Sequence, residues 1–387
     1  MKKFLALLLA LVMSLSMVAC GGGSDTTTDE STDAEGDTSE NATYQVAMIT
    51  DYGDITDQSF NQTTYEACQE FCDAEGIQFN YYKPQGDSTA DRVAMVDAAI
   101  ADGYNVVVMP GYAFAETIKQ TAELYPDVTF VALDVAQGDL DPNGEGYTLP
   151  SNVYCAVYQE ELCGYMAGYA AVKLGYKHLG VLGGMAVPAV QRFGYGFVQG
   201  ADAAAVEMGI ADQVVMEYAY GNQFYGDADI TAYMDNWYQT LGVQVVFASG
   251  GGIYTSAAEA AAKVGGKLIG VDVDQSANID TYGEGMCVTS AMKGLAETVK
   301  HMLSEVLAGN FANYGGKIET LGLVSGDDPT ANYVQLPMET TQWGDGFTQD
   351  DYKALVKAMY DGEVTVSNDI SAMPATTITV NFAGNIK

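Results

Sequence analysis

Short apolar runs alternate with longer amphipathic segments along most of the chain. The first apolar run is Gln45–Thr50, and similar runs follow at residues 79–83, 106–109, 129–133, 152–157, 179–182, 214–218, 245–248, 267–271 and 287–291. Helix-length segments lie between most of these runs, at residues 61–75, 87–102, 160–174, 190–208 and 254–264. Strands that alternate with helices form parallel sheets covered on both faces, with right-handed crossovers. The pattern therefore predicts an α/β fold with doubly wound parallel sheets.

The length of the chain predicts two such sheets. Residues 44–387 exceed what one hydrophobic core usually supports, which is about 250–300 residues. We expect a first lobe built from residues 44–155 with about 287–317, and a second lobe built from residues 156–286 with about 318–387. Two lobes joined by crossing segments can close on a ligand held between them.

The amino-terminal segment has the pattern of a secretory signal peptide. Lys2 and Lys3 precede a run of apolar and small residues that extends to Ala19 and stops at Cys20. This run is shorter than the about 20 apolar residues that span a bilayer, and polar residues follow it. We therefore expect residues 1–19 to be a signal peptide that is removed.

The end of this run also resembles the bacterial lipobox, with Met-Val-Ala-Cys at residues 17–20. The resemblance implies that Cys20 carries acyl chains and anchors the protein on the extracytoplasmic face of the cell membrane. From Gly21 to Asn41 the chain has no large apolar residue, so residues 20–43 are predicted to be a lipidated cysteine and a disordered tether. The alternative is an ordinary signal peptide followed by an incidental cysteine.

Acidic residues dominate the composition. The sequence holds 51 Asp and Glu against 16 Lys and Arg, which gives a formal net charge of −35. This charge repels nucleic acid and disfavours polyanionic ligands such as phosphorylated compounds. We expect a neutral or cationic small-molecule ligand, no nucleic-acid partner and a monomeric protein.

Cysteines and histidines do not form a metal-binding pattern. With Cys20 assigned to the lipid, an odd number of cysteines remains, which allows at most two disulfides: Cys68, Cys72, Cys155, Cys163 and Cys287. Cys68 and Cys72 share one predicted helix, where they are expected to pack as small apolar residues. Only His178 and His301 could supplement them, so we expect no metal and no cofactor.

The predicted strands end in loops of a common character. In open parallel sheets the ligand site lies beyond the carboxyl ends of the strands. Polar or glycine-rich residues follow the strands at 51–61, 110–112, 134, 183–185, 249–252, 272–275 and 292–294. Glycines allow close backbone approach, and carboxylate, amide and lysine groups supply directed hydrogen bonds. Any one loop could be only a turn or a helix cap, as at Asp57 or Ser59. Their convergence favours a binding site.

One of these loops resembles a known family motif. Gly53–Gln62 is similar to the opening motif of the basic membrane protein (BMP) family of lipoproteins. Further segments agree in order: Tyr125–Asp127 with the strand that precedes Asp134, Gly183–Met185, Phe193–Gly200, Gly270–Gln275 and Ser290–Lys293. The resemblance covers about residues 44–310 and does not extend clearly over residues 311–387. It implies a type I periplasmic-binding-protein fold, purine-nucleoside binding between two lobes, and delivery to the permease of an ABC transporter.

The resemblance also implies which aromatic residues bind the base. Phe60 and an aromatic residue of the other lobe, Phe193 or Phe224, would stack on its two faces. Stacking of a base on an aromatic ring contributes about 1–3 kcal/mol. Phe193 is equally compatible with core packing beside Phe197.

Polar contacts are assigned by the same resemblance. The residues concerned are Asp51, Asn61 and Asp134 for the polar edge of the base, and Asp272, Lys293 and the backbone of Gly251 for the ribose. A carboxylate accepts hydrogen bonds from hydroxyl groups, and Lys293 beside Asp272 would keep that carboxylate ionised. These groups do not distinguish a purine from a pyrimidine.

Other functions are less well supported by the sequence. The chain has neither a Gly-x-Ser-x-Gly elbow nor a Gly-x-x-x-x-Gly-Lys-Ser/Thr phosphate loop, and both histidines lie away from the predicted strand ends. A binder is therefore expected rather than an enzyme. The alternatives are a binding protein for a sugar or another small polar ligand, a nucleosidase that uses only carboxylates, and a surface adhesin or sensor.

Overall fold

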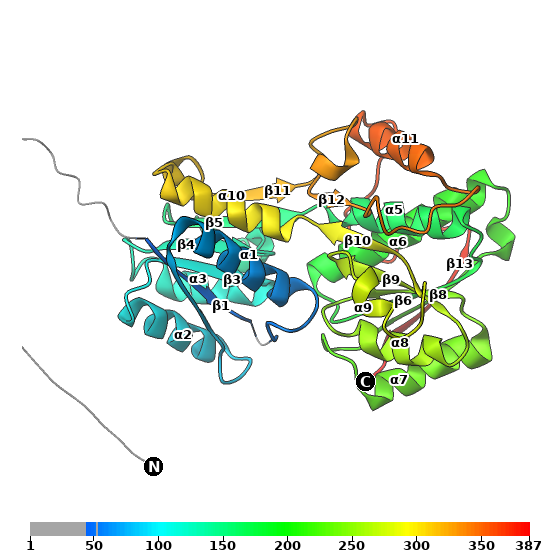
Figure 1. Cartoon of the computed structure of the whole chain (residues 1–387), viewed down its shortest axis with the longest axis horizontal. Helices are drawn as coiled ribbons and strands as arrows, with labels where there is room; N and C mark the ends of the chain where they lie inside the picture. The colour runs from blue at the N-terminus through cyan, green and yellow to red at the C-terminus, as the bar shows by residue number, and fades with distance from the viewer. Residues whose placement is uncertain (1–43, 52) are drawn as a thin grey trace, which may run out of the picture. The chain divides into compact units, whose positions relative to one another are not determined.

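The computed structural model describes residues 44–51 and 53–387, and Thr43–Lys387 forms one compact unit. Figure 1 shows its two sheets, each with helices packed against it. We call each sheet with its helices a lobe. The predicted signal peptide, Cys20 and the predicted tether lie outside the described residues.

The first sheet has six strands in the order β11-β5-β4-β3-β1-β2. The strands are β1 (Gln45–Ile49), β2 (Gln78–Tyr82), β3 (Val106–Pro110), β4 (Thr129–Leu133), β5 (Val153–Tyr158) and β11 (Lys317–Leu321). All neighbouring strands run parallel. Its helices are α1 (Phe60–Glu75), α2 (Thr89–Ala101), α3 (Ala115–Thr121), α4 (Gln137–Leu140) and α10 (Leu295–Leu307), of which α10 packs on α1.

The second sheet has seven strands in the order β12-β10-β9-β8-β6-β7-β13. The strands are β6 (His178–Gly183), β7 (Val215–Tyr220), β8 (Val245–Ser249), β9 (Lys267–Asp272), β10 (Cys287–Lys293), β12 (Val334–Gln335) and β13 (Thr379–Asn385). β12 pairs antiparallel with β10, and the other neighbours run parallel. Its helices are α5 (Glu160–Lys173), α6 (Pro188–Glu207), α7 (Ala228–Asp235), α8 (Tyr254–Ala262), α9 (Ser276–Ile279) and α11 (Gln349–Tyr360).

The alternation of strands and helices expected from the sequence is confirmed. Every predicted strand and helix is present, and parallel pairing dominates both sheets. Short helical turns occupy Tyr112–Phe114, Ala211–Gln213, Asn236–Leu241, Phe311–Asn313 and Pro329–Ala331. The part of the chain without a clear family resemblance adds β11 to the first sheet and β12 and β13 to the second.

The chain passes between the sheets three times, after β5, after β10 and between β11 and β12. Backbone hydrogen bonds join these crossings. Gln159 N donates to Leu321 O at 2.9 Å, Gly294 N donates to Tyr333 O at 2.7 Å, and Tyr333 N donates to Gly322 O at 3.0 Å. The crossings therefore lie side by side, and we call them the hinge region.

The structure corrects one part of the expected lobe assignment. Residues 287–293 were expected in the first lobe, but they form β10, which lies in the second sheet beside β9. The reason is pairing: Ser290 and Ala291 lie in parallel register with Gly270 and Val271, so the crossing follows this strand instead of preceding it. The exact lobe boundaries otherwise stay a prediction.

Helices α5 and α6 touch backbone to backbone. A Cβ atom added to Gly164 would lie 2.2 Å from Phe193 O, and one added to Gly196 would lie 2.2 Å from Glu161 O. Gly168 and Gly200 have equally close backbone neighbours across the same interface. Real Cβ atoms cannot approach so closely, so only glycine allows this packing.

In the described part of the chain, every cysteine is free and buried: Cys68, Cys72, Cys155, Cys163 and Cys287. Burial raises the pKa of their thiols, for example to about 12 for Cys155 and Cys287. Among residues 44–51 and 53–387, no helix is both long and apolar enough to span a bilayer.

Candidate functional site

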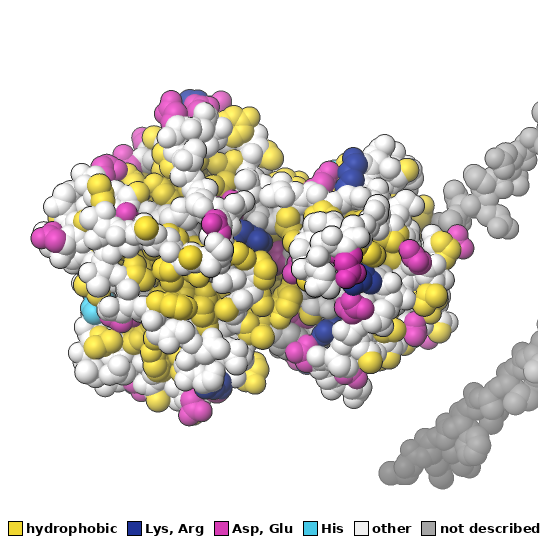
Figure 2. Space-filling model, turned by 180° about the vertical axis from the view of Figure 1, so that it is seen from behind, with side chains coloured by type: hydrophobic (Ala, Val, Ile, Leu, Met, Phe, Trp, Pro, Cys, Tyr) yellow, Lys and Arg dark blue, Asp and Glu magenta, His cyan; other side chains and the backbone are white. Residues whose placement is uncertain are grey.

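A cavity of about 530 Å³ lies where the carboxyl ends of strands from both sheets meet. Every residue that the sequence singled out for ligand binding lines it: Asp51, Phe60, Asn61, Asp134, Phe193, Phe224, Gly251, Asp272 and Lys293. On the face shown in Figure 2, the described part is hollowed between its two halves, and hydrophobic side chains gather on one side of this hollow. The sequence thus located the cavity, whereas contact of each residue with a ligand stays a prediction.

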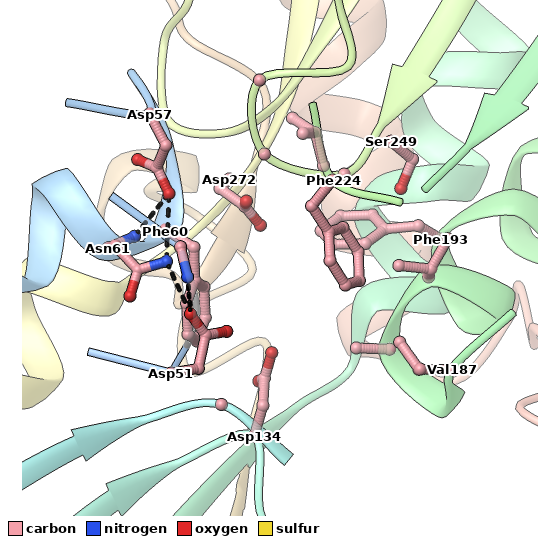
Figure 3. A pocket seen from close by; sticks show the side chains of 18 of the residues that line it. Asp51, Asp57, Phe60, Asn61, Asp134, Val187, Phe193, Phe224, Ser249 and Asp272 are labelled. Carbon is pink, nitrogen blue, oxygen red and sulfur yellow. Dashed lines mark hydrogen bonds between the residues drawn. The ribbon is translucent and has the colours of Figure 1, made fainter. Parts of the chain in front are cut away.

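One side of the cavity, which we call the polar wall, consists of Asp51, Asp57, Asn61 and Asp134. The Asp57 carboxylate accepts hydrogen bonds from the backbone N–H groups of Ser59 at 2.9 Å and Asn61 at 3.0 Å, so it caps helix α1. Asn61 Nδ2 donates to Asp57 at 3.2 Å and to Asp51 at 3.3 Å. These bonds orient Asp51, Asp57 and Asn61, and dashed lines in Figure 3 mark those that Asn61 makes to the two carboxylates. Asp134 is held by Lys293.

The opposite side, which we call the apolar wall, consists of Val187, Phe193, Phe224 and Gly250. The Phe224 ring lies over glycine: a Cβ atom on Gly184 would be 2.5 Å from Phe224 Cδ1, and one on Gly250 would be 3.0 Å away. We expected these glycines to let backbone approach a ligand, but here they make room for an aromatic side chain. Figure 3 shows Phe60 and Phe224 on opposite sides of the cavity.

Phe193 and Phe224 differ in how much of each ring reaches the cavity. Phe193 is only 2% exposed and packs edge to face on Phe247, with ring centroids 6.0 Å apart. Phe224 is only partly buried. The packing alternative considered for Phe193 therefore accounts for most of its surface, and Phe224 is the main aromatic group of the apolar wall.

Between the walls lies Lys293, surrounded by carboxylates and rings. Its Nζ lies 2.5 Å from Asp134 Oδ2, 3.5 Å from Glu160 Oε1 and 3.8 Å from Asp272 Oδ1. The centroids of the Phe60, Tyr158 and Phe193 rings lie 4.8, 5.3 and 5.5 Å from the same atom. A lysine in such a position is a buried cation held by both ion pairs and ring faces.

Lys293 does not fully offset the rise in pKa that burial causes in the carboxyl groups around it. Burial raises the pKa of Asp134 from 3.8 to about 6; Lys293 opposes this rise, and Glu160 adds to it. Burial also raises the pKa of Asp272, against the opposing effect of Lys293. For Lys293 burial lowers the pKa, but the carboxylates outweigh it and raise the value above 10.5. Lys293 therefore acts on Asp272 in the expected direction, since it lowers the pKa of that carboxyl group, but burial has the larger effect and the net pKa is raised.

Sequence reasoning missed three contributors to this centre. Glu160 is 0% exposed, and Arg192, which lines the cavity, donates from Nε to Glu160 Oε2 at 2.6 Å. Ser59 Oγ donates to Asp272 Oδ2 at 2.6 Å, which connects helix α1 to the end of β9. The signal available for Glu160 was an acidic residue at the start of an otherwise apolar helix, which usually indicates only an interaction with the helix dipole.

Backbone strain also concentrates here. Among the described residues, the non-glycine residues with positive φ are Gln58, Asn222, Asp134 and Asp272. Asp134 (φ 60°) directly follows β4, and Asp272 (φ 66°) ends β9. Such conformations cost about 1–3 kcal/mol each and cluster at functional sites, where they aim a side chain. Both of these carboxylates face Lys293.

Two parallel sheets, three crossings and a cavity at the strand ends define a solute-binding protein of the periplasmic-binding-protein type. Residues 44–327 match the sequence profile of the Bmp family, described as "ABC transporter substrate-binding protein PnrA-like". The chain belongs to this family, as its motifs indicated.

Relatives and solved structures agree with this assignment. The CD4+ T-cell-stimulating antigen of Listeria innocua is 27% identical over 339 residues, which covers 82% of this chain and 87% of that protein. The ABC transporter nucleoside-binding protein BmpA of Lactococcus lactis is 26% identical over 343 residues, which covers 83% and 88%. An ABC transporter solute-binding protein from Aeropyrum pernix has a TM-score of 0.63 at 24% identity and covers 84% of this chain and 88% of its own. This last likeness supports the fold alone.

Proposed function

We propose that this protein binds a nucleoside in the cavity and delivers it to an ABC import permease. The observation that carries the proposal is the pairing of a polar wall with an apolar wall across one cavity, with Asp272 between them. Lys293 lines the same cavity beside Asp272 and Asp134. A nucleoside has the same division, because its base offers flat apolar faces and its edge and ribose offer polar groups. The name of the Lactococcus lactis relative supports the same ligand class.

In this proposal the base lies between Phe60 and Phe224, and its edge meets the polar wall at Asp51, Asn61 and Asp134. The ribose hydroxyls donate to Asp272 and accept from Lys293, beside the backbone of Gly251. Every one of these residues lines the cavity. The acidic lining and the formal charge of −35 disfavour phosphorylated nucleosides.

The remaining parts of the proposal concern location and motion. A lipid on Cys20 would hold the protein at the membrane surface near its permease, after removal of residues 1–19. The hinge region would let the lobes close on the nucleoside, and the closed form would present the surface that the permease recognises.

A thermal-shift screen of the protein tests the ligand class. Adenosine, guanosine, inosine, cytidine, adenine, ribose, arabinose and amino acids are compared, because a ligand that binds only the native state raises its melting temperature. We expect a rise with purine nucleosides and none with ribose. A rise only with a sugar or an amino acid would overturn the nucleoside assignment and leave the family assignment in place.

Chromatography of the ligand after incubation separates binding from hydrolysis. A binding protein returns the nucleoside intact, whereas a carboxylate-dependent nucleosidase returns base and ribose. We expect intact nucleoside, and release of free base at a rate that scales with protein concentration would establish the enzymatic alternative.

A further inference from the structure

Two of the three crossings between the sheets bring opposite charges together. Glu160 begins α5 just after β5, and Lys293 ends β10 just before the chain returns to the first sheet. Lys293 Nζ lies 3.5 Å from Glu160 Oε1, and both side chains are buried. The pair therefore lies in the hinge region, although Lys293 also lines the cavity.

Glu160 is held firmly from its other side. Its Oε2 accepts the 2.6 Å hydrogen bond from Arg192 on α6. Because α5 and α6 touch through their glycines, the helices that carry Glu160 and Arg192 are held at a fixed separation. A planar guanidinium in such a bond also fixes the plane of the carboxylate. The second oxygen of Glu160 is thereby aimed at Lys293.

Apart from Glu160 and the ligand-facing carboxylates, no group among the described residues fixes the direction in which the Lys293 ammonium points. Its four-carbon stem is flexible, and the rings around it attract a cation without fixing a direction. Its other charged neighbours, Asp134 and Asp272, are the groups proposed to bind the nucleoside. Lys293 already pairs with Asp134 Oδ2, so without Glu160 it would move toward Asp272 and compete with the ligand for that carboxylate.

We propose that Glu160 is a positioning residue, which holds the Lys293 ammonium on Asp134 Oδ2 at the hinge so that Asp134 Oδ1 and Asp272 remain available to the ligand. The predicted effect on ligand binding rests on the proposed function. The position of the Lys293 ammonium does not, because it can be measured in the protein alone. Glu160 acts through Lys293 and does not line the cavity.

The neighbouring residue Glu161 provides a matched control. It lies on the same turn of α5 and is 3% exposed, yet its Oε2 has no hydrogen-bond partner and it forms no ion pair among the described residues. Burial raises the pKa of Glu161 to about 7. Glu161→Gln therefore removes a buried acid next in sequence without removing a partner of Lys293.

The charged groups around the Glu160 carboxylate come from several elements: Lys293 from β10, Arg192 from α6, Glu161 from α5, Asp134 after β4 and Asp272 at the end of β9. Glu160 raises the pKa of both Asp134 and Asp272 by repulsion. Removing its charge lowers both values. The pH below which protonation of Asp134 and Asp272 weakens ligand binding should therefore be lower in Glu160→Gln than in the wild type. A purely structural role of Glu160 would not produce this shift.

The test compares Glu160→Gln and Glu161→Gln in the full chain by calorimetric titration with guanosine and inosine between pH 4.5 and 8. We expect Glu160→Gln to raise the Kd about tenfold or more at pH 7.5, since hydrogen bonds to charged groups are strong. We also expect the pH below which binding weakens to be lower in this variant. Glu161→Gln should stay within about twofold of the wild type. Equal Kd values and equal pH profiles in the two variants would overturn the proposal.

A second measurement needs no ligand. The lysine side-chain methylene next to Nζ gives an NMR signal that responds to the position of the ammonium, and Lys293→Arg assigns the signal of Lys293. We expect this signal to shift in Glu160→Gln and to stay unchanged in Glu161→Gln. If the wild type binds no nucleoside, the proposed function fails while this comparison still decides the role of Glu160.

Loss of Glu160 removes the carboxylate that accepts from Arg192 Nε, and breaking a largely buried ion pair is destabilising. If Glu160→Gln does not fold, the charge-balanced double variant Glu160→Gln/Arg192→Gln replaces it, with Arg192→Gln alone as its control. An unchanged Lys293 signal in the folded double variant would overturn the proposal.

Discussion

The polar wall is held by hydrogen bonds among its own side chains, whereas the apolar wall is held by contact between an aromatic ring and glycine. Asp57 and Asn61 are fixed by bonds to helix α1 and to each other. Phe224 keeps its place because Gly184 and Gly250 leave space for its ring. Binding at the polar wall should therefore weaken when a hydrogen-bond donor or acceptor is removed. Binding at the apolar wall should weaken when a side chain is enlarged or the Phe224 ring is removed.

The strongest test of the comparison removes a group that lies between the two walls. Asp272→Ala should weaken nucleoside binding about 100-fold or more, because a carboxylate that accepts from two hydroxyls contributes about 1.5–3 kcal/mol per bond. Titration calorimetry measures the loss. The variant must remain folded, and its melting temperature is expected to fall, because alanine is strained at φ 66° and Ser59 Oγ loses its acceptor.

Asp272→Asn is the matched control for this variant. Asparagine tolerates the positive φ of the site and keeps an acceptor for Ser59, but it lacks the charge. Its affinity should fall between those of the wild type and Asp272→Ala. Wild-type affinity in a folded Asp272→Ala protein would refute the ribose assignment.

The next largest effect is expected on the apolar wall. Phe224→Ala should raise the Kd about 10- to 100-fold, because one base–aromatic stack contributes about 1–3 kcal/mol. Phe224→Tyr keeps a ring and should stay close to the wild type. If the alanine variant binds normally, the base does not stack on Phe224, and Phe193 becomes the candidate.

Lowering the pH should weaken ligand binding through the polar wall and leave the apolar wall unaffected. The pKa of Asp134 is about 6, so its carboxylate accepts hydrogen bonds above this pH and loses that ability below it. We expect the Kd to rise about tenfold per pH unit below pH 6. Asp134→Asn should remove this part of the pH dependence, and an unchanged profile would show that another group causes it.

The effect on stability has the opposite sign. The folded-state pKa of Asp134 is raised above its ordinary value of 3.8, so its contribution to stability is complete below that value and is lost as the pH rises through about 6. Acid therefore weakens binding through Asp134 without destabilising the fold through the same group. Thermal denaturation at pH 5 and pH 7 separates the two effects.

The smallest effect is expected from added bulk. In Gly184→Ala the new Cβ would meet the Phe224 ring at 2.5 Å, so the ring must rotate or shift. We expect a rise in Kd of about 3- to 10-fold with a fall in stability of about 1–2 kcal/mol, as for other overpacked sites. The double variant Gly184→Ala/Phe224→Ala should bind no more weakly than Phe224→Ala alone. Additive losses would show that Gly184 acts independently of the ring.

The sequence predicted the elements and strand ends well because both depend on local patterns. Alternating apolar and amphipathic runs follow from pairing and burial, and residues such as Asp51, Asp134 and Asp272 stand directly after such runs. A parallel sheet brings its carboxyl ends together whatever the details of packing. These residues could therefore be placed in one cavity from the sequence.

Residues whose role depends on long-range packing could not be placed in this way. Glu160 acquires its importance from Arg192, which is 32 residues away, and from Lys293, which is 133 residues away. The effect of Gly184 depends on the path of the loop that carries Phe224. The sheet to which 287–293 belongs depends on pairing with β9, and no local pattern encodes that choice.

The buried thiols can serve as probes of the order in which the two lobes unfold. Cys68, Cys72 and Cys155 belong to elements of the first lobe, and Cys163 and Cys287 belong to elements of the second. Burial protects all of them from alkylation, both by blocking access and by raising their pKa values. Pulsed alkylation during denaturation, read by mass spectrometry, would therefore show which lobe opens first, without any engineered probe.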